Sequence, residues 1–305
     1  MSAHNKAGAA EPASVPKVLG RASGGERSLR SLVFLGVLWL CLAVGMVFLV
    51  TLVVTTLMDG LSRMDSRLFT RYPASNPERA GARPAIIGSI WVIGATAVLA
   101  IPLGVAAAVF LEEFADPRKK INQIIEVNVQ NLAAIPSIVY GLLTLSLLGL
   151  IGLGNKNLVI VGATALALLI LPVIIISTRE ALRGVPGEIR QGSLALGATP
   201  LQTVWRQTLP SAIPGIATGA ILALSRALGE AAPLLLLGGL VFLSFDPNGL
   251  LSGYTTMPIQ IFNWVGRPQA GFHTLAAAAS ILLLGMLLVM NSIAILIRNK
   301  YQQRW

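Results

Sequence analysis

Arg226 and Glu230 are charged residues that stand inside a long apolar run, residues 219–239. An Arg at the centre of a membrane-spanning helix costs about 2.5–3.5 kcal/mol to insert, so it is kept where it faces a partner, the protein interior or a water-filled path. One interpretation is a neutralising helix pair at i and i+4 that only holds the helices together. The other is that Arg226 lends positive potential to an anion path, because its planar fork matches oxyanions, while Glu230 orients it. In that case Arg226 guides the anion weakly, since conduction requires release.

A second group of polar residues lies in the apolar run that begins near residue 130. Asn131, Ser137 and Tyr140 could hydrogen-bond an anion in transit, or they could join neighbouring helices. The sequence places Pro136 in this run and Pro233 in the run of Arg226. Proline removes a backbone hydrogen bond and kinks a helix, so both prolines are predicted gating kinks.

Arg179, Arg183 and Arg190 follow the fourth apolar run. They are typical of the positive residues that orient a membrane protein. An electrostatic exit funnel for an anion is the alternative, and Arg179 is its best candidate because it stands closest to the apolar run.

The composition indicates a polytopic membrane protein in a lipid bilayer. Of the 305 residues, 54% are hydrophobic and 12% are charged, against about 25% charged in soluble domains. The net charge of +10 suggests nucleic acid at first, but the positive residues cluster beside the ends of apolar runs, so no nucleic-acid partner is predicted. A single Cys excludes a disulfide framework and a Cys-based metal site. Because GxxxxGK[ST], HExxH and GxSxG are absent, we expect neither ATP hydrolysis by this chain nor an enzyme.

A membrane span needs about 20 mostly apolar residues, and six runs of the chain qualify. The predicted fold is therefore all-α, with residues 1–30 as a disordered tail and residues 31–305 as a transmembrane domain. The six predicted spans cover residues 32–57, 86–111, 130–153, 158–178, 211–238 and 273–297.

The distribution of Lys and Arg predicts that both termini lie in the cytosol. With that orientation, fifteen of the 23 Lys and Arg residues fall on the cytosolic side and seven on the outer side. Positive residues favour cytoplasmic loops, so this orientation is preferred over its inverse.

The longest polar interruption on the predicted inner side is residues 184–209, here called the elbow. Its apolar residues mark a short amphipathic helix that Gly197 ends in a left-handed conformation. Thr199 is placed to cap a second short helix that has Pro at its first position, and Pro210 marks the return to the membrane. A helix–Gly–helix of this kind suits a groove on a soluble partner; an ordinary interfacial loop is the alternative.

Residues 191–210 (QGSLALGATPLQTVWRQTLP) resemble the coupling-loop motif of ATP-binding-cassette importer permeases. That motif begins Glu-Ala-Ala, has Gly six residues after the Glu and ends in Leu-Pro. Here Gly197 and the Leu-Pro pair match, whereas Gln191 stands where the motif has Glu. The resemblance implies an ATPase-coupling surface made of Gln191, Ala195, Leu196, Gly197, Ala198, Thr199, Leu209 and Pro210.

Four other stretches resemble the A-type permease subunits of phosphate importers. They are residues 129–143 (VQNLAAIPSIVYGLL), 225–236 (SRALGEAAPLLL), 257–269 (MPIQIFNWVGRPQ) and 291–305 (NSIAILIRNKYQQRW). The resemblance implies the six-span, MetI-like fold of type I importer permeases in a bacterial cytoplasmic membrane. It also implies a homologous C-type permease partner, two copies of a cytosolic ATPase that binds ATP and Mg²⁺, and an extracytoplasmic phosphate-binding protein.

Three other functions stay open at this point. A permease for another oxyanion, such as sulfate or molybdate, would use the same architecture. A channel or ion-coupled carrier would need no ATPase. A membrane scaffold without transport would use Arg226 and Glu230 for packing alone.

Overall fold

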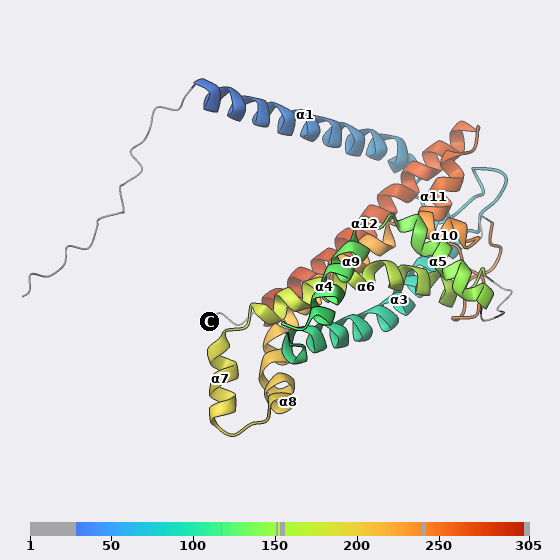
Figure 1. Cartoon of the computed structure of the whole chain (residues 1–305). Coiled ribbons are helices and arrows are strands. Elements are labelled where there is room, and N and C mark those ends of the chain that lie inside the picture. The colour runs from blue at the N-terminus through green and yellow to red at the C-terminus, as the bar shows by residue number, and fades with distance from the viewer. Residues whose placement is uncertain (1–28, 117, 151, 153–155, 240–241, 302–305) are drawn as a thin grey trace, which may run out of the picture. The chain divides into compact units, whose positions relative to one another are not determined.

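The computed structural model describes residues 29–116, 118–150, 152, 156–239 and 242–301 (Figure 1). Throughout these residues the regular structure is helical, which confirms the predicted all-α class. The elements in chain order are α1 (Leu29–Gly60), η1 (Leu61–Arg63), α2 (Ser66–Thr70), α3 (Arg83–Val109), η2 (Phe110–Phe114), α4 (Lys120–Ala133), α5 (Ser137–Leu150), α6 (Val159–Arg183), α7 (Gly187–Ala195), α8 (Pro200–Thr203), η3 (Val204–Thr208), α9 (Leu209–Leu228), α10 (Ala232–Leu236), α11 (Met257–Val265) and α12 (Ala270–Tyr301).

The chain divides into two compact units, the first ending at Val53 and the second starting at Val54. The described part of the first unit is the apolar N-terminal portion of α1. The second unit is a helical bundle that carries every predicted site residue. The predicted disordered tail falls almost wholly on residues 1–28, which lie outside the described residues.

Five helical runs of the described chain are long and apolar enough to cross a membrane, and a bent pair makes a sixth if it counts as one span. The five runs cover residues 31–63, 83–114, 159–183, 200–228 and 270–300, and the bent pair joins α4 to α5 at 110°. The described helices thus give five or six candidate spans, and the third and fifth differ most from their predicted bounds.

The third span departs from its predicted bounds of residues 130–153. The helical run begins ten residues earlier, at Lys120, and breaks between Ala133 and Ser137. Pro136 disfavours helical geometry at the residue before it and supplies no backbone donor, so α4 and α5 meet at an angle there. The predicted kink at Pro136 is confirmed as a full break.

The fifth span also differs from its prediction of residues 211–238. Helical structure is continuous from Pro200 through η3 and α9, so Pro210 does not mark a re-entry point. The predicted break at Pro233 comes earlier, because α9 ends at Leu228 and Gly229 caps it. Pro233 instead stands in the first turn of α10, where its missing N–H costs nothing.

Helix α6 is the centre of the bundle, and small residues let its neighbours approach closely. A Cβ added to Gly104 of α3 would stand 2.6 Å from Ile174 Cγ2, and one added to Gly219 of α9 would stand 2.5 Å from Ser177 Cβ. Small residues of this kind bring helix backbones together where lipid supplies no hydrophobic driving force. Leu166 and Ile170 of α6 are fully buried in the resulting core.

Several Arg residues that the sequence placed on the outer side have polar or aromatic partners. Arg83 pairs with Asp246 at 2.6 Å, and Arg63 donates to the carbonyl of Pro77 at 2.7 Å. Arg267 lies over the ring of Phe272. Tyr254, in the segment before α11, packs against Gly162, and burial raises the pKa of its hydroxyl. The segments outside the spans are therefore folded onto the bundle.

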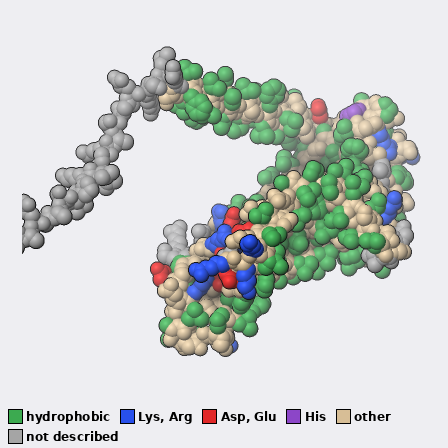
Figure 2. Space-filling view, viewed as in Figure 1, with side chains coloured by type: hydrophobic (Ala, Val, Ile, Leu, Met, Phe, Trp, Pro, Cys, Tyr) green, Lys and Arg blue, Asp and Glu red, His purple; other side chains and the backbone are tan. Residues whose placement is uncertain are grey.

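Apolar side chains cover most of the visible bundle surface, while charged side chains gather near α7 and α8 (Figure 2). These two helices hang side by side at one end of the bundle (Figure 1). The charged end of the bundle is therefore the end that carries the elbow.

Candidate functional site

Arg226 lies in the last turn of α9, and Glu230 lies just beyond the end of that helix. The Arg226 Nε atom stands 3.8 Å from Glu230 Oε1, and the two side chains are 52% and 22% exposed. A cation in the last turn complements the helix dipole. Because Gly229 ends the helix between them, the pair is looser than a hydrogen-bonded pair and leaves much of the guanidinium accessible.

Tyr140 stabilises the bend between α4 and α5. Its buried hydroxyl donates to the carbonyl of Leu132 at 2.7 Å. That carbonyl also accepts from the Ile135 N–H at 3.1 Å, but it has no i+4 donor because Pro136 lacks an N–H. Tyr140 thus holds the bend from the α5 side, which is the helix-joining role. Ser137 begins α5 and is half-buried, whereas Asn131 and Pro136 are exposed.

Three elements converge around Arg226. The backbone of Pro233 in α10 approaches Gly141 of α5 so closely that a Cβ on the glycine would stand 2.9 Å from Pro233 Cα. Tyr140 and Ala227, the residue that follows Arg226, belong to the same buried apolar cluster. Arg226, Tyr140 and the broken region before Pro233 therefore share one region of the bundle.

Arg179 belongs to a different region, at the elbow end of α6. Its Nε atom stands 3.0 Å from Glu112 Oε2 and its Nη1 atom 3.1 Å from Glu126 Oε1. Arg183 pairs with the same Glu112 at 2.7 Å. These carboxylates compensate the charge of Arg179, whose side chain is only 12% exposed; its assignment to an exit path stays a prediction.

The third Arg of this region, Arg190 of α7, pairs with Glu113 at 2.8 Å. We call the six residues Glu112, Glu113, Glu126, Arg179, Arg183 and Arg190 the elbow-side ion-pair cluster. The sequence analysis identified the three Arg residues and missed the three Glu residues. A usable signal was present, since the Glu112-Glu113 pair directly follows an apolar run in a chain with only 13 acidic residues.

The elbow has the helix–Gly–helix geometry that its sequence predicts. Helix α7 ends before Gly197, whose φ is +87°. Thr199 accepts a hydrogen bond from the Gln202 backbone, and the Gln202 side chain accepts one from the Thr199 N–H, which together form a capping box. Ser193 and Thr203 join the two short helices through their hydroxyl oxygens, 2.9 Å apart.

The predicted coupling residues form the outer face of the elbow. Leu196 is 91% exposed, and Gln191, Ala195, Gly197, Thr199 and Pro210 are exposed as well, whereas Ala198 and Leu209 are half-buried. Leu201 and Trp205, which the prediction left out, are also largely exposed. A hollow of about 420 Å³ opens between the two arms and is lined by Glu188, Ile189, Gly192, Ser193, Leu196, Ala198, Gln202, Arg206 and Gln207.

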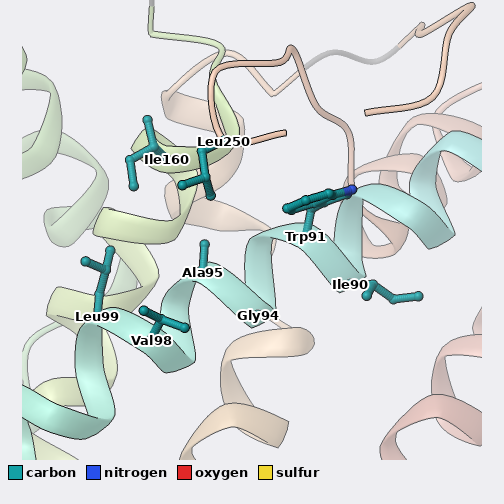
Figure 3. Close-up of a pocket in the computed structure, with 8 residues that line it drawn as sticks. All are labelled: Ile90, Trp91, Gly94, Ala95, Val98, Leu99, Ile160 and Leu250. Atoms are coloured by element: carbon teal, nitrogen blue, oxygen red, sulfur yellow. The ribbon is translucent and has the colours of Figure 1, made fainter. Parts of the chain in front are cut away.

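A separate apolar pocket of about 480 Å³ lies along α3 (Figure 3). Side chains of α3 line it together with Ile160 of α6 and Leu250, and the lining carries no charged group. Such a lining cannot compensate an oxyanion. Over the described residues, no group of three or more His, Cys, Asp or Glu could hold a metal ion.

Comparison with known proteins places the chain in a family. Residues 100–303 match the family model described as binding-protein-dependent transport system inner membrane component. The chain belongs to this family. It is therefore a multi-pass, non-catalytic membrane permease subunit of an ABC transport system, and the elbow is the segment that resembles the coupling loop of such permeases.

Curated relatives of this permease cover most of its length. A Bacillus subtilis protein called "Probable ABC transporter permease protein YqgI" is 36% identical over 74% of this chain and 76% of its own length. The Mycobacterium tuberculosis "Phosphate transport system permease protein PstA 1" is 36% identical over 72% of this chain and 70% of its own. The Haemophilus influenzae "Phosphate transport system permease protein PstA" is 29% identical over 87% and 92%.

Solved structures support the fold of this permease. An inward-facing MetNI methionine ABC transporter chain superposes with a TM-score of 0.59 at 20% identity, over 75% of this chain and all of that chain. A chain of a bacterial ABC transporter that imports the polysaccharide alginate gives a TM-score of 0.60 at 16% identity, over 90% and 97%. The importer-permease fold expected from the sequence is thereby confirmed.

Proposed function

We propose that this permease is the A-type subunit of an ATP-driven importer of inorganic phosphate. The observation that carries the proposal is the similarity to phosphate transport permeases of three genera. The matches span 70% of the Mycobacterium protein and 92% of the Haemophilus protein cited above. A Xylella fastidiosa PstA is 32% identical, and the match spans 85% of its length. The family match, residues 100–303, includes Arg226, the half-exposed cation that pairs with Glu230 in a mostly apolar run.

The subunit works in an assembly. It pairs with a homologous C-type permease, and the phosphate path runs between the two. Two copies of a cytosolic ATPase dock below and bind ATP and Mg²⁺, while an extracytoplasmic phosphate-binding protein delivers the anion from outside. Both termini lie in the cytosol, and the elbow receives one ATPase copy.

The continuous helical run that follows the elbow supports a mechanism in which an ATPase docked on the elbow moves α9. Helical structure runs unbroken from Pro200 to Leu228, so a displacement at α8 moves the whole of α9. Seventeen residues separate Leu209 from Arg226, which corresponds to about 26 Å along a helix. Because the hydrocarbon core is about 30 Å thick, Arg226 lies toward the side of the membrane opposite the elbow, where phosphate enters.

Arg226 guides phosphate in transit and does not hold it tightly. Its half-exposed guanidinium offers a planar donor set for oxyanions, and the loose 3.8 Å pair with Glu230 offsets part of its charge. Because Glu230 compensates part of the Arg226 charge, Arg226 binds phosphate only weakly. Weak binding allows phosphate to be released along the path. Tight capture belongs to the separate binding protein.

Uptake of ³²P-labelled phosphate tests the proposal in cells that lack their own phosphate importers and express this permease with its neighbouring transport genes. We expect ATP-dependent uptake that excess unlabelled phosphate abolishes and excess sulfate or molybdate does not. Competition by sulfate or molybdate would indicate a permease for another oxyanion. Uptake without ATP, by a chain that recruits no ATPase on purification, would indicate a channel or carrier.

A further inference from the structure

Arg190 joins three separate parts of the inner end of the bundle. From its position on α7, its guanidinium donates to the Glu113 carboxylate through Nη2 at 2.8 Å and through Nε at 3.3 Å. The same guanidinium donates to the carbonyl of Leu182 at 2.8 Å and to that of Val185 at 3.0 Å. One side chain therefore connects the elbow, the end of α6 and the end of the α3–η2 span.

The π-helical turn η2 positions the partner of Arg190. Glu112 and Glu113 are consecutive residues of this turn, yet Glu112 pairs with Arg179 and Arg183 of α6 while Glu113 pairs with Arg190 of α7. Consecutive residues of a helical turn point in different directions, so the carboxylates of this one turn reach two different helices. Glu113 is only 9% exposed and Arg190 26%, so water screens this pair less than a surface pair.

Apart from Arg190, α7 is joined to the helical run that begins at α8 through Ser193 and Thr203, whose hydroxyl oxygens lie 2.9 Å apart. None of the nine residues of α7 is buried, and Pro186 precedes it. Ile189 packs against the apolar cluster around Leu182 and Val185, but apolar contacts have little directionality. The forked hydrogen bonds of Arg190 fix both the position and the rotation of α7, because a guanidinium binds in a defined plane.

We propose that Arg190 and Glu113 form a clasp that transmits ATPase-driven movement of the elbow to the inner end of the α3–η2 span. The inference rests on the proposed function and adds a positioning pair to it. The α8–η3–α9 run continues directly from the elbow. The α3–η2 span touches the elbow region through the apolar contacts of Val105 and Val109, and the clasp adds a directional polar connection to its end. Both spans then move together, as a concerted switch between two states of the path requires.

The first test measures movement without any transported anion. Nitroxide labels are placed on Ala115, beside η2, and on Arg298 of α12, in a Cys41→Ser background, within the full complex reconstituted in nanodiscs. We expect ATP with vanadate to change the distance between the labels in the unsubstituted complex. Arg190→Ala or Glu113→Ala should abolish the change while the complex still assembles and hydrolyses ATP.

The second test measures coupling as phosphate taken up per ATP hydrolysed in proteoliposomes. Losing a coupling free energy of ordinary size should lower this ratio about 5- to 150-fold. The double variant Arg190→Ala with Glu113→Ala should be no worse than either single variant, because both substitutions remove the same contact. Arg118→Ala is the control, since it removes an exposed Arg just after η2 and should leave the ratio unchanged.

The results separate this inference from the proposed function. An unsubstituted complex that takes up no phosphate refutes phosphate import, whatever the labels report. Absence of an ATP-driven distance change in that complex, or a full change in Arg190→Ala, overturns the clasp. Additive losses in the double variant overturn it as well, because they would show two independent contributions.

Discussion

Gly197 turns the elbow between α7 and α8, and Gly197→Ala isolates the backbone energy of that turn. A Cβ at this position would meet nothing within 4 Å, so the substitution causes no clash, but φ is +87°. An L-residue in the left-handed region costs about 1–2 kcal/mol. That cost changes an equilibrium about 5- to 30-fold. If the elbow must hold this turn to dock, the ATPase should bind the variant more weakly by up to that factor.

The assay is titration of the purified ATPase onto the permease pair in nanodiscs, with Gly187→Ala as the matched control. Gly187 also has nothing within 4 Å of an added Cβ, but it begins α7 and its φ is not positive. Alanine there should leave docking intact or improve it slightly through helix propensity. Equal affinity of Gly197→Ala and the unsubstituted protein, or an equal loss in both variants, would refute the reasoning.

Three further substitutions probe the bundle and its path. Arg226→Ala should lower phosphate uptake while the complex assembles normally. Unchanged uptake would favour the interpretation that Arg226 and Glu230, whose Nε and Oε1 atoms lie 3.8 Å apart, serve packing alone. Gly104→Val should lower the thermal stability of the complex by about 1–3 kcal/mol through overpacking against Ile174, whereas Gly94→Ala, with open space around it, should not. Tyr140→Phe should cost about 1 kcal/mol of stability, because it removes a hydrogen bond to a carbonyl that ends α4; an unchanged melting temperature would contradict that role.

Local rules account for the parts of the fold that the sequence predicted well. The elbow followed from capping chemistry, since a glycine can adopt positive φ and a Thr can accept the orphan N–H groups of a helix start. The apolar runs followed from the bilayer, which requires about 20 apolar residues per span. These features depend on residues within a few positions of each other, so a single sequence reveals them.

Errors in the prediction arose where proline was interpreted without its position in the helix. Pro136 coincides with a break between α4 and α5, whereas Pro210 is accommodated inside a continuous helical run, just after the π-helical turn η3. The break near Pro233 was predicted, but Gly229 rather than the proline ended α9. Helix ends are decided by which groups find partners, and hydropathy does not report that.

The sequence by itself determined the all-α membrane class of the protein, its apolar runs, the elbow and the two charges at residues 226 and 230. Only the tertiary structure decided which carboxylates pair with Arg179, Arg183 and Arg190. Their partners Glu112 and Glu113 are separated from Arg183 and Arg190 by 71 and 77 positions, and no local pattern links residues so far apart. Ion pairs and close helix contacts form between elements that packing brings together, so their partners are fixed only when α3, α6 and α7 are placed in space.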